Sequence, residues 1–166
     1  RSEKEVYEKL GLPWVPPELR EARLEFDGDE PRPLPNLIVE EDLRADLHMH
    51  TNATDGANSL EEMVAAAQAR GLEYIAITDH SKRVSMAQGL DAARTLQQWE
   101  EIDALNAKLD GSFRVWKGIE CDILESGEMD LPEDVLAQAD WVMASIHYGQ
   151  KQSKQQITDR LLGAIA

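Results

Sequence analysis

The chain has 166 residues, which fits one ordinary domain or a domain with an extension. Its 17 basic and 32 acidic residues give a net charge of −15, which argues against nucleic-acid binding driven by charge alone, because phosphate binding needs a basic surface. The single cysteine, Cys121, excludes an internal disulfide, and no apolar run approaches the ~20 residues of a membrane helix. We therefore expect a cytoplasmic protein that does not contact membranes.

The first 44 residues differ in composition from the rest. They hold six of the seven prolines, and proline is excluded from helix interiors and central strands. A short helix is expected at Lys4–Leu10, ended by Gly11. The remainder reads as an irregular connector, so we place a domain boundary between residues 44 and 45.

A regular pattern begins at Ala45. Apolar, β-branched runs predict four strands, at 45–50, 74–80, 113–123 and 141–149. Helical patterns follow each of them, at 59–72, 91–111, 131–139 and 153–165. Ser59 with Glu62, and Ser153 with Gln156, have the spacing of capping boxes. This alternation predicts an α/β fold with parallel strands and crossover helices.

All four histidines fall at the ends of the expected strands. His48 and His50 share one face of the first strand, because side chains alternate along a strand. His80 ends the second strand and His147 lies near the end of the fourth, with Glu120 late in the third. Parallel strands present their carboxyl ends at one edge, where α/β proteins build their sites. We therefore expect these side chains to converge.

Mixed imidazole and carboxylate ligands favour zinc, manganese or iron, and two adjacent metals can hydrolyse phosphoesters. Asp55 is a further candidate ligand, although an aspartate before Gly56 is also typical of a turn. A lone histidine at a strand end would more simply be structural. Glu120 alone could be an edge carboxylate with a salt-bridge partner, but its position at the shared edge favours a ligand role. Asp46 and Asp79 fit a role in orienting metal-bound imidazoles.

Two cations follow His80 along the chain. Lys82 and Arg83 would meet either a substrate phosphate or solvent. Cys121 points away from Glu120 and is expected to pack in the core.

Four segments, taken in order, resemble the successive motifs of the PHP (polymerase and histidinol phosphatase) family. They are DLHMHTNATDG at 46–56, AITDHS at 76–81, GIECDIL at 118–124 and ASIHYG at 144–149. A further segment, EKLGLPWVPPELRE at 8–21, is similar to the end of the catalytic region of family X DNA polymerases, which a PHP domain follows in the bacterial members.

The resemblance implies a distorted (β/α)7 barrel, with about four strand–helix units present here, and a cluster of up to three divalent transition metals. It assigns 1–44 to the end of a polymerase region with its linker, and 45–166 to the first part of the PHP domain. His48 and His50 would bind one metal and Glu120 would bridge it to a second. Six ligands are implied altogether: His48, His50, Asp55, His80, Glu120 and His147. Glu120 and Asp55 are the implied catalytic residues.

The family pattern calls for a further histidine and an Asp-x-His beyond Ala166. We therefore expect part of a longer protein, an open partial barrel whose last helix exposes apolar surface. The activity implied is metal-dependent hydrolysis of DNA phosphodiesters or end phosphates, of the 3′–5′ exonuclease type, in DNA repair. Its partners would be DNA and an upstream polymerase domain. Alternatives are a non-catalytic PHP module that supports the polymerase and a small-substrate phosphatase of the histidinol-phosphatase type.

Overall fold

The computed structural model describes residues 2–20 and 35–165. They divide into two units, Arg1–Val39 and Glu40–Ala166. The first unit contains α1 (Glu3–Lys9) and a 3-10 turn, η1 (Pro17–Leu19). The expected helix at the N-terminus is thus confirmed to within one residue. Much of the expected connector, residues 21–34, lies outside the described residues.

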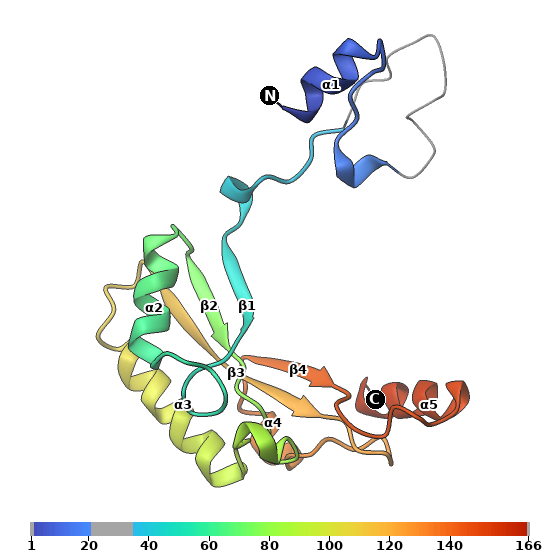
Figure 1. The fold of residues 1–166 in the computed structure, drawn as a ribbon. Coiled ribbons are helices and arrows are strands. Elements are labelled where there is room, and N and C mark those ends of the chain that lie inside the picture. Colours follow the sequence, from blue (N-terminus) through green and yellow to red (C-terminus); the bar gives the residue numbers. More distant parts are fainter. Residues whose placement is uncertain (1, 21–34, 166) are drawn as a thin grey trace. The chain divides into compact units, whose positions relative to one another are not determined.

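Four strands of the second unit form one parallel sheet. They are β1 (Ala45–Met49), β2 (Tyr74–Ile77), β3 (Arg114–Asp122) and β4 (Trp141–Ser145). Their order in the sheet is their order in the chain, and the sheet curls as a partial barrel would (Figure 1). The predicted α/β fold of four strand–helix units is confirmed.

Successive strands are connected by α2 (Leu60–Ala69), α3 (Ala92–Asn106) and α4 (Glu133–Leu136). Helix α5 (Lys154–Ile165) follows β4, and short 3-10 turns, η2 (Glu40–Asp42) and η3 (Ser85–Ala87), precede β1 and α3. Both α2 and α3 run along one face of the sheet (Figure 1). The capping boxes Ser59–Glu62 and Ser153–Gln156 form as predicted, and Asp91 caps α3.

Several elements are shorter than their sequence patterns suggest; β4 ends at Ser145 rather than at 149, and α3 ends at Asn106 rather than at 111. The expected helix at 131–139 is α-helical over four residues, because Gln138 and Ala139 donate to carbonyls three residues back and tighten the last turn. The second strand formally ends at Ile77, yet its pairing continues: Glu120 N–H donates to Asp79 O and Ser81 N–H donates to Glu120 O. An isolated bridge therefore joins His80 to Glu120.

The hydrophobic core lies on the helix side of the sheet. Ile75, Ile77, Val115, Ile119 and Cys121 alternate along β2 and β3 and are fully buried there. Burial of Cys121 agrees with its predicted packing role and raises the pKa of its thiol to about 11. The residues between them face the opposite side of the sheet, where the histidines lie.

The last helix exposes apolar side chains, as expected. Leu161, Leu162 and Ile165 of α5 are all exposed. Across residues 2–20 and 35–165, no helix combines the length and hydrophobicity needed to cross a membrane.

Candidate metal centre

Strand ends and one loop bring all six expected ligands together. The end of β1 supplies His48 and His50, and the loop after it supplies Asp55. The segments after β2 and β4 supply His80 and His147, and β3 supplies Glu120. Ring centroids lie 5.4 Å apart for His48 and His50, 4.3 Å for His50 and His80, and 5.1 Å for His80 and His147.

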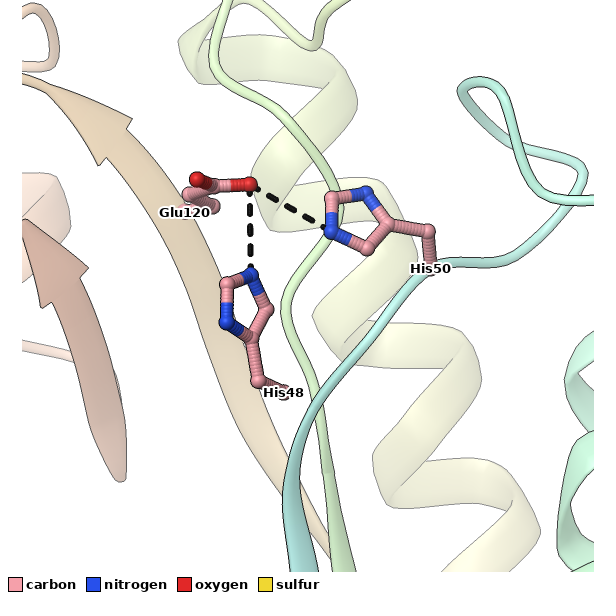
Figure 2. A group of neighbouring side chains, drawn as sticks. All are labelled: His48, His50 and Glu120. Atoms are coloured by element: carbon pink, nitrogen blue, oxygen red, sulfur yellow. Dashed lines mark ion pairs between the residues drawn. The ribbon is translucent and has the colours of Figure 1, made fainter. Parts of the chain in front are cut away.

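The carboxylate of Glu120 is the centre of this arrangement. Its Oε2 lies 3.3 Å from Nε2 of His48 and 3.3 Å from Nε2 of His50 (Figure 2). The same oxygen is 3.1 Å from His80 Nδ1, and Oε1 is 3.4 Å from His147 Nε2. Glu120 is 5% exposed, so one nearly buried carboxylate faces four imidazoles.

Asp55 reaches the cluster from its rim. Its Oδ1 lies 3.3 Å from His50 Nδ1 and its Oδ2 lies 3.5 Å from His80 Nε2, while 51% of its side chain stays exposed. Gly56 lets the loop fold back, since a Cβ there would stand 2.4 Å from His50 O. The turn and the ligand interpretation of Asp55 are therefore compatible.

Ligand atoms gather into three overlapping groups of three. These are His48–His50–Glu120, His50–Asp55–His80 and His80–Glu120–His147, each with its ligand atoms within 4.8 Å of one another. His50, His80 and Glu120 each belong to two groups. Shared ligands of this kind are what neighbouring metal ions require.

The hydrogen bonding of two buried nitrogens tests whether cations fit. Nδ1 of His50 and Nδ1 of His80 have no hydrogen-bond partner within the described part of the chain. Each nevertheless lies close to a carboxylate oxygen, at 3.3 and 3.1 Å. The atoms are near enough for ion pairs, but the directions of approach do not permit hydrogen bonds. Buried nitrogens beside carboxylates without hydrogen bonds suit a bound cation.

The charge states of the cluster agree with this. Burial lowers the pKa of His80, against the opposing effect of Glu120, so its imidazole is neutral and able to act as a ligand at neutral pH. Burial would raise the pKa of Glu120, but a hydrogen bond from Ser145 and the contact with His48 outweigh it and hold that pKa below its usual value. Glu120 is therefore an anion.

The hydrogen bonds of Asp79 hold the loop after β1, whereas the sequence suggested that Asp79 orients an imidazole. The fully buried carboxylate accepts hydrogen bonds from Thr51 N–H at 2.9 Å, Thr51 Oγ1 at 2.6 Å and Gln98 Nε2 at 2.5 Å, and another from Thr54 Oγ1. Thr51 and Thr54 lie between His50 and Asp55 in the chain. Asp79 thus positions two ligands through the backbone between them. Nothing in the sequence marked Thr51, Thr54 or Gln98 as its partners.

The other sequence candidates have local partners. Asp46 accepts the backbone N–H of His48 at 3.1 Å, beside a shift in the β1–β2 register. Arg83 is held by acidic side chains, with Glu125 at 2.6 Å and Asp122 at 2.8 Å, so it is not free for a substrate phosphate. Lys82 is exposed.

Comparison with known proteins agrees with the geometry. The PHP domain family matches residues 46–164, and the DNA polymerase beta thumb family matches residues 1–21. The chain belongs to the PHP domain family. The resemblance seen in the four motifs and in the polymerase-like segment is thereby confirmed.

Its relatives include both a polymerase and phosphatases. The chain is 45% identical over 99% of its length to "DNA polymerase/3'-5' exonuclease PolX" of Bacillus subtilis, covering 28% of that protein. It is 36% identical over 63% of its length to a "Probable phosphatase" of Caldicellulosiruptor saccharolyticus and 38% identical over 61% to one of Photobacterium profundum. It covers 42% and 39% of those two proteins, so this PHP chain spans less than half of each of these relatives.

Proposed function

We propose that this PHP chain is the metal-binding portion of a phosphoesterase that hydrolyses DNA phosphodiesters or end phosphates, of the 3′–5′ exonuclease type, within a family X DNA polymerase active in DNA repair. One observation carries the proposal: three ligand groups overlap through Glu120, His50 and His80. A structural module has no need of such convergence. The relative named as a polymerase and exonuclease supports the choice of substrate.

The resemblance implies how the six ligands divide among the cations. His48, His50 and Glu120, which form one ligand group, would hold one cation, with Asp55 completing its shell from the rim. His80 and Glu120 would hold the second and His147 the third, although these three side chains lie together in one ligand group. Manganese, zinc or iron suits this mixture of nitrogen and oxygen donors. When bound, such cations would lower the pKa of a water molecule and stabilise charge on a phosphate.

The two proposed catalytic carboxylates differ in exposure. Glu120 lies beneath the imidazoles, nearly buried, and its anionic carboxylate fixes the spacing of their ring nitrogens. Asp55 stands at the mouth of the cluster with half its side chain exposed. Its carboxylate is placed to accept a proton from water that approaches the site.

The polymerase setting is proposed from the first part of the chain. The polymerase thumb match at 1–21 and the separate unit Arg1–Val39 support assigning 1–44 to the end of a polymerase region with its linker. The chain itself carries a net charge of −15, so we propose that bound cations and an adjoining polymerase domain supply the DNA contacts. The lone Cys121 supports a cytoplasmic, reducing setting.

Hydrolysis assays on the natural protein that contains this chain test the proposal. His48→Ala and Glu120→Gln should abolish manganese-stimulated hydrolysis of a single-stranded DNA 3′ end while polymerisation remains measurable. Glu73→Gln is the matched control, because Glu73 pairs with Arg44 on the surface, with both side chains more than half exposed. Exonuclease rates that are equal in the control and both site variants would refute the catalytic assignment.

A second candidate is a phosphatase for small phosphate monoesters. The similarity to several proteins named "Probable phosphatase" favours it. The same variants separate the two candidates, since a monoesterase would lose turnover of a small phosphate ester and would never degrade DNA.

A further inference from the structure

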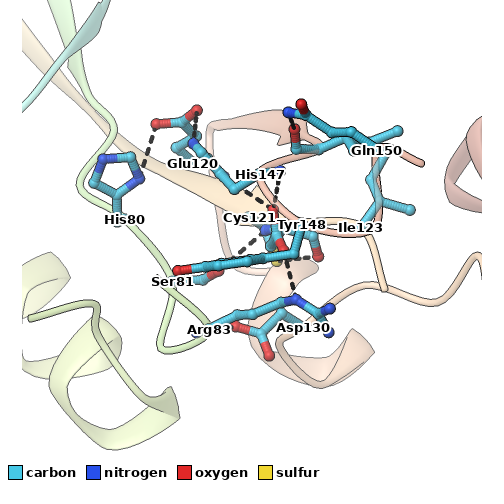
Figure 3. A network of polar contacts seen from close by, with 12 residues as sticks. His80, Ser81, Arg83, Glu120, Cys121, Ile123, Asp130, His147, Tyr148 and Gln150 are labelled. Carbon is cyan, nitrogen blue, oxygen red and sulfur yellow. Dashed lines mark hydrogen bonds and ion pairs between the residues drawn. The ribbon is translucent and has the colours of Figure 1, made fainter. Parts of the chain in front are cut away.

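A second carboxylate of β3, outside the six expected ligands, holds His147. Asp122 is fully buried, and its Oδ1 accepts the backbone N–H of His147 at 2.9 Å. The same oxygen lies 2.9 Å from Nδ1 of the His147 ring. His147 belongs to a network of polar contacts that also contains Glu120 and Arg83 (Figure 3). One oxygen thus fixes both the backbone and the ring of one residue, which determines the direction of the imidazole.

This contact selects the tautomer of His147. An ionised carboxylate only accepts hydrogen bonds, so the proton of a neutral imidazole must reside on Nδ1. Nε2 then carries a lone pair, and it faces Glu120 Oε1 at 3.4 Å. Two lone pairs that face each other at this distance repel, and a cation bound between them would relieve that repulsion.

Arg83 holds Asp122 from the other side. Its Nε lies 2.8 Å from Asp122 Oδ2. The direction of approach does not permit a hydrogen bond, so the two groups form an ion pair. Arg83 is itself fixed, because Glu125 accepts from its terminal nitrogen at 2.6 Å and Asp130 accepts from its backbone N–H at 2.8 Å. The ring of Tyr148, next to His147, lies 5.4 Å from the guanidinium carbon.

We propose that Asp122 and Arg83 are a positioning pair for His147: Asp122 imposes the Nδ1–H tautomer, and Arg83 balances the buried charge of Asp122. The inference rests on the proposed metal-dependent function. Carboxylates that accept the second N–H of an imidazole orient it and strengthen it as a metal ligand. Neither residue belongs to the three ligand groups, so both act through His147.

Imidazole nitrogen NMR of the metal-free chain, with ¹⁵N-labelled histidine, tests the tautomer without any assay of activity. His147 should show the proton on Nδ1 in the wild type. Asp122→Ala should redistribute that proton between the two nitrogens. Asp122→Asn should also disturb it, because the amide NH₂ is a donor and meets either the Arg83 guanidinium or the N–H groups of His147. A wild-type spectrum with the proton on Nε2 overturns the inference, whether or not any variant folds.

Manganese titration tests the consequence. Asp122→Ala should weaken one of the bound Mn²⁺ ions by about 10- to 100-fold and leave the others unchanged. Arg83→Met should weaken the same ion, and Arg83→Lys should recover part of the loss because the charge remains. Asp140→Ala is the matched control: this exposed carboxylate also accepts a backbone N–H, from Lys117, but contacts no histidine.

The outcomes separate the two proposals. In the natural protein that contains this chain, a His147 protonated on Nδ1 without any binding of Mn²⁺ contradicts the proposed function and leaves the contact between Asp122 and His147 as described. A chain that binds Mn²⁺ equally well with aspartate or alanine at 122 supports the proposed function and overturns the positioning role.

Discussion

His80 and Glu120 meet twice, through the backbone and through their side chains. A β-bridge joins the two residues beyond the formal end of β2, and His80 Nδ1 lies 3.1 Å from Glu120 Oε2. The rigid pairing of β2 with β3 therefore sets the distance between two candidate ligands before any metal binds. A site held by strand pairing needs little reorganisation, which favours tight binding.

The overlap of the three ligand groups predicts unequal losses of metal. His48 and His147 each belong to one group, whereas His50 and Glu120 belong to two. In the natural protein that contains this chain, His48→Ala or His147→Ala should release about one bound manganese ion, and Glu120→Ala should release about two. Elemental analysis after dialysis against trace Mn²⁺ gives the ratio of metal to protein.

The surface variant Glu73→Gln serves as the control for these ratios. Equal losses for His48→Ala and Glu120→Ala would show that the groups do not share Glu120 as the geometry indicates.

Asp79 should matter for stability and for the site together. Asp79→Ala leaves buried donors of Thr51 and Gln98 without an acceptor, at a cost of about 3 kcal/mol in the free energy of unfolding. Urea denaturation measures this loss. Asp103→Ala, which removes an exposed pairing with Lys117, should cost less than about 1 kcal/mol. Similar losses for both variants would mean that the buried network contributes no more than a surface pair.

The sequence predicted the convergence of the histidines for a definite physical reason. Side chains alternate along strands and parallel strands end at one edge, so the positions of His48, His50, His80 and His147 follow from strand assignment alone. The fold class followed from the same periodicity. Whether each of these side chains binds metal stays a prediction.

Partners of the buried carboxylates lay beyond such reasoning. Asp122 meets Arg83 and Asp79 meets Gln98 only because a loop and a helix fold back over the sheet, and no local period encodes that approach. The length of α4 also depended on tertiary context, since 3-10 bonds replaced its last α-helical turn. These features are set by packing between distant segments.

Arg160 holds helix α5 against the segments that follow β3 and β4, so replacing it should lower the stability of the fold. This fully buried side chain of α5 donates to Tyr148 O at 2.8 Å and, through two nitrogens, to Ile123 O. It therefore ties α5 to the segments that follow β3 and β4. Arg160→Ala should destabilise the fold by about 3 kcal/mol, because two buried carbonyls lose charge-assisted donors.

Arg160→Lys tests whether geometry or charge matters there. A lysine ammonium has no planar fork, so it should restore less than half of the loss measured by urea denaturation. Full recovery with lysine would show that the fixed guanidinium geometry is not needed.

Cys121 predicts a dependence of stability on pH. Burial raises the pKa of its thiol from 9.0 to about 11, so the unfolded chain releases this proton at a lower pH than the folded chain. The stabilisation is complete below the unfolded pKa and is lost as pH rises toward the folded value. The free energy of unfolding should therefore fall more steeply between about pH 9 and about pH 11 in the wild type than in Cys121→Ala. Because Cys121 is fully buried, a thiol reagent should also label the native chain far more slowly than the chain in urea. If the wild type and Cys121→Ala lose stability in parallel as the pH rises, and the reagent labels the native thiol rapidly, then Cys121 is in contact with solvent, contrary to the structure.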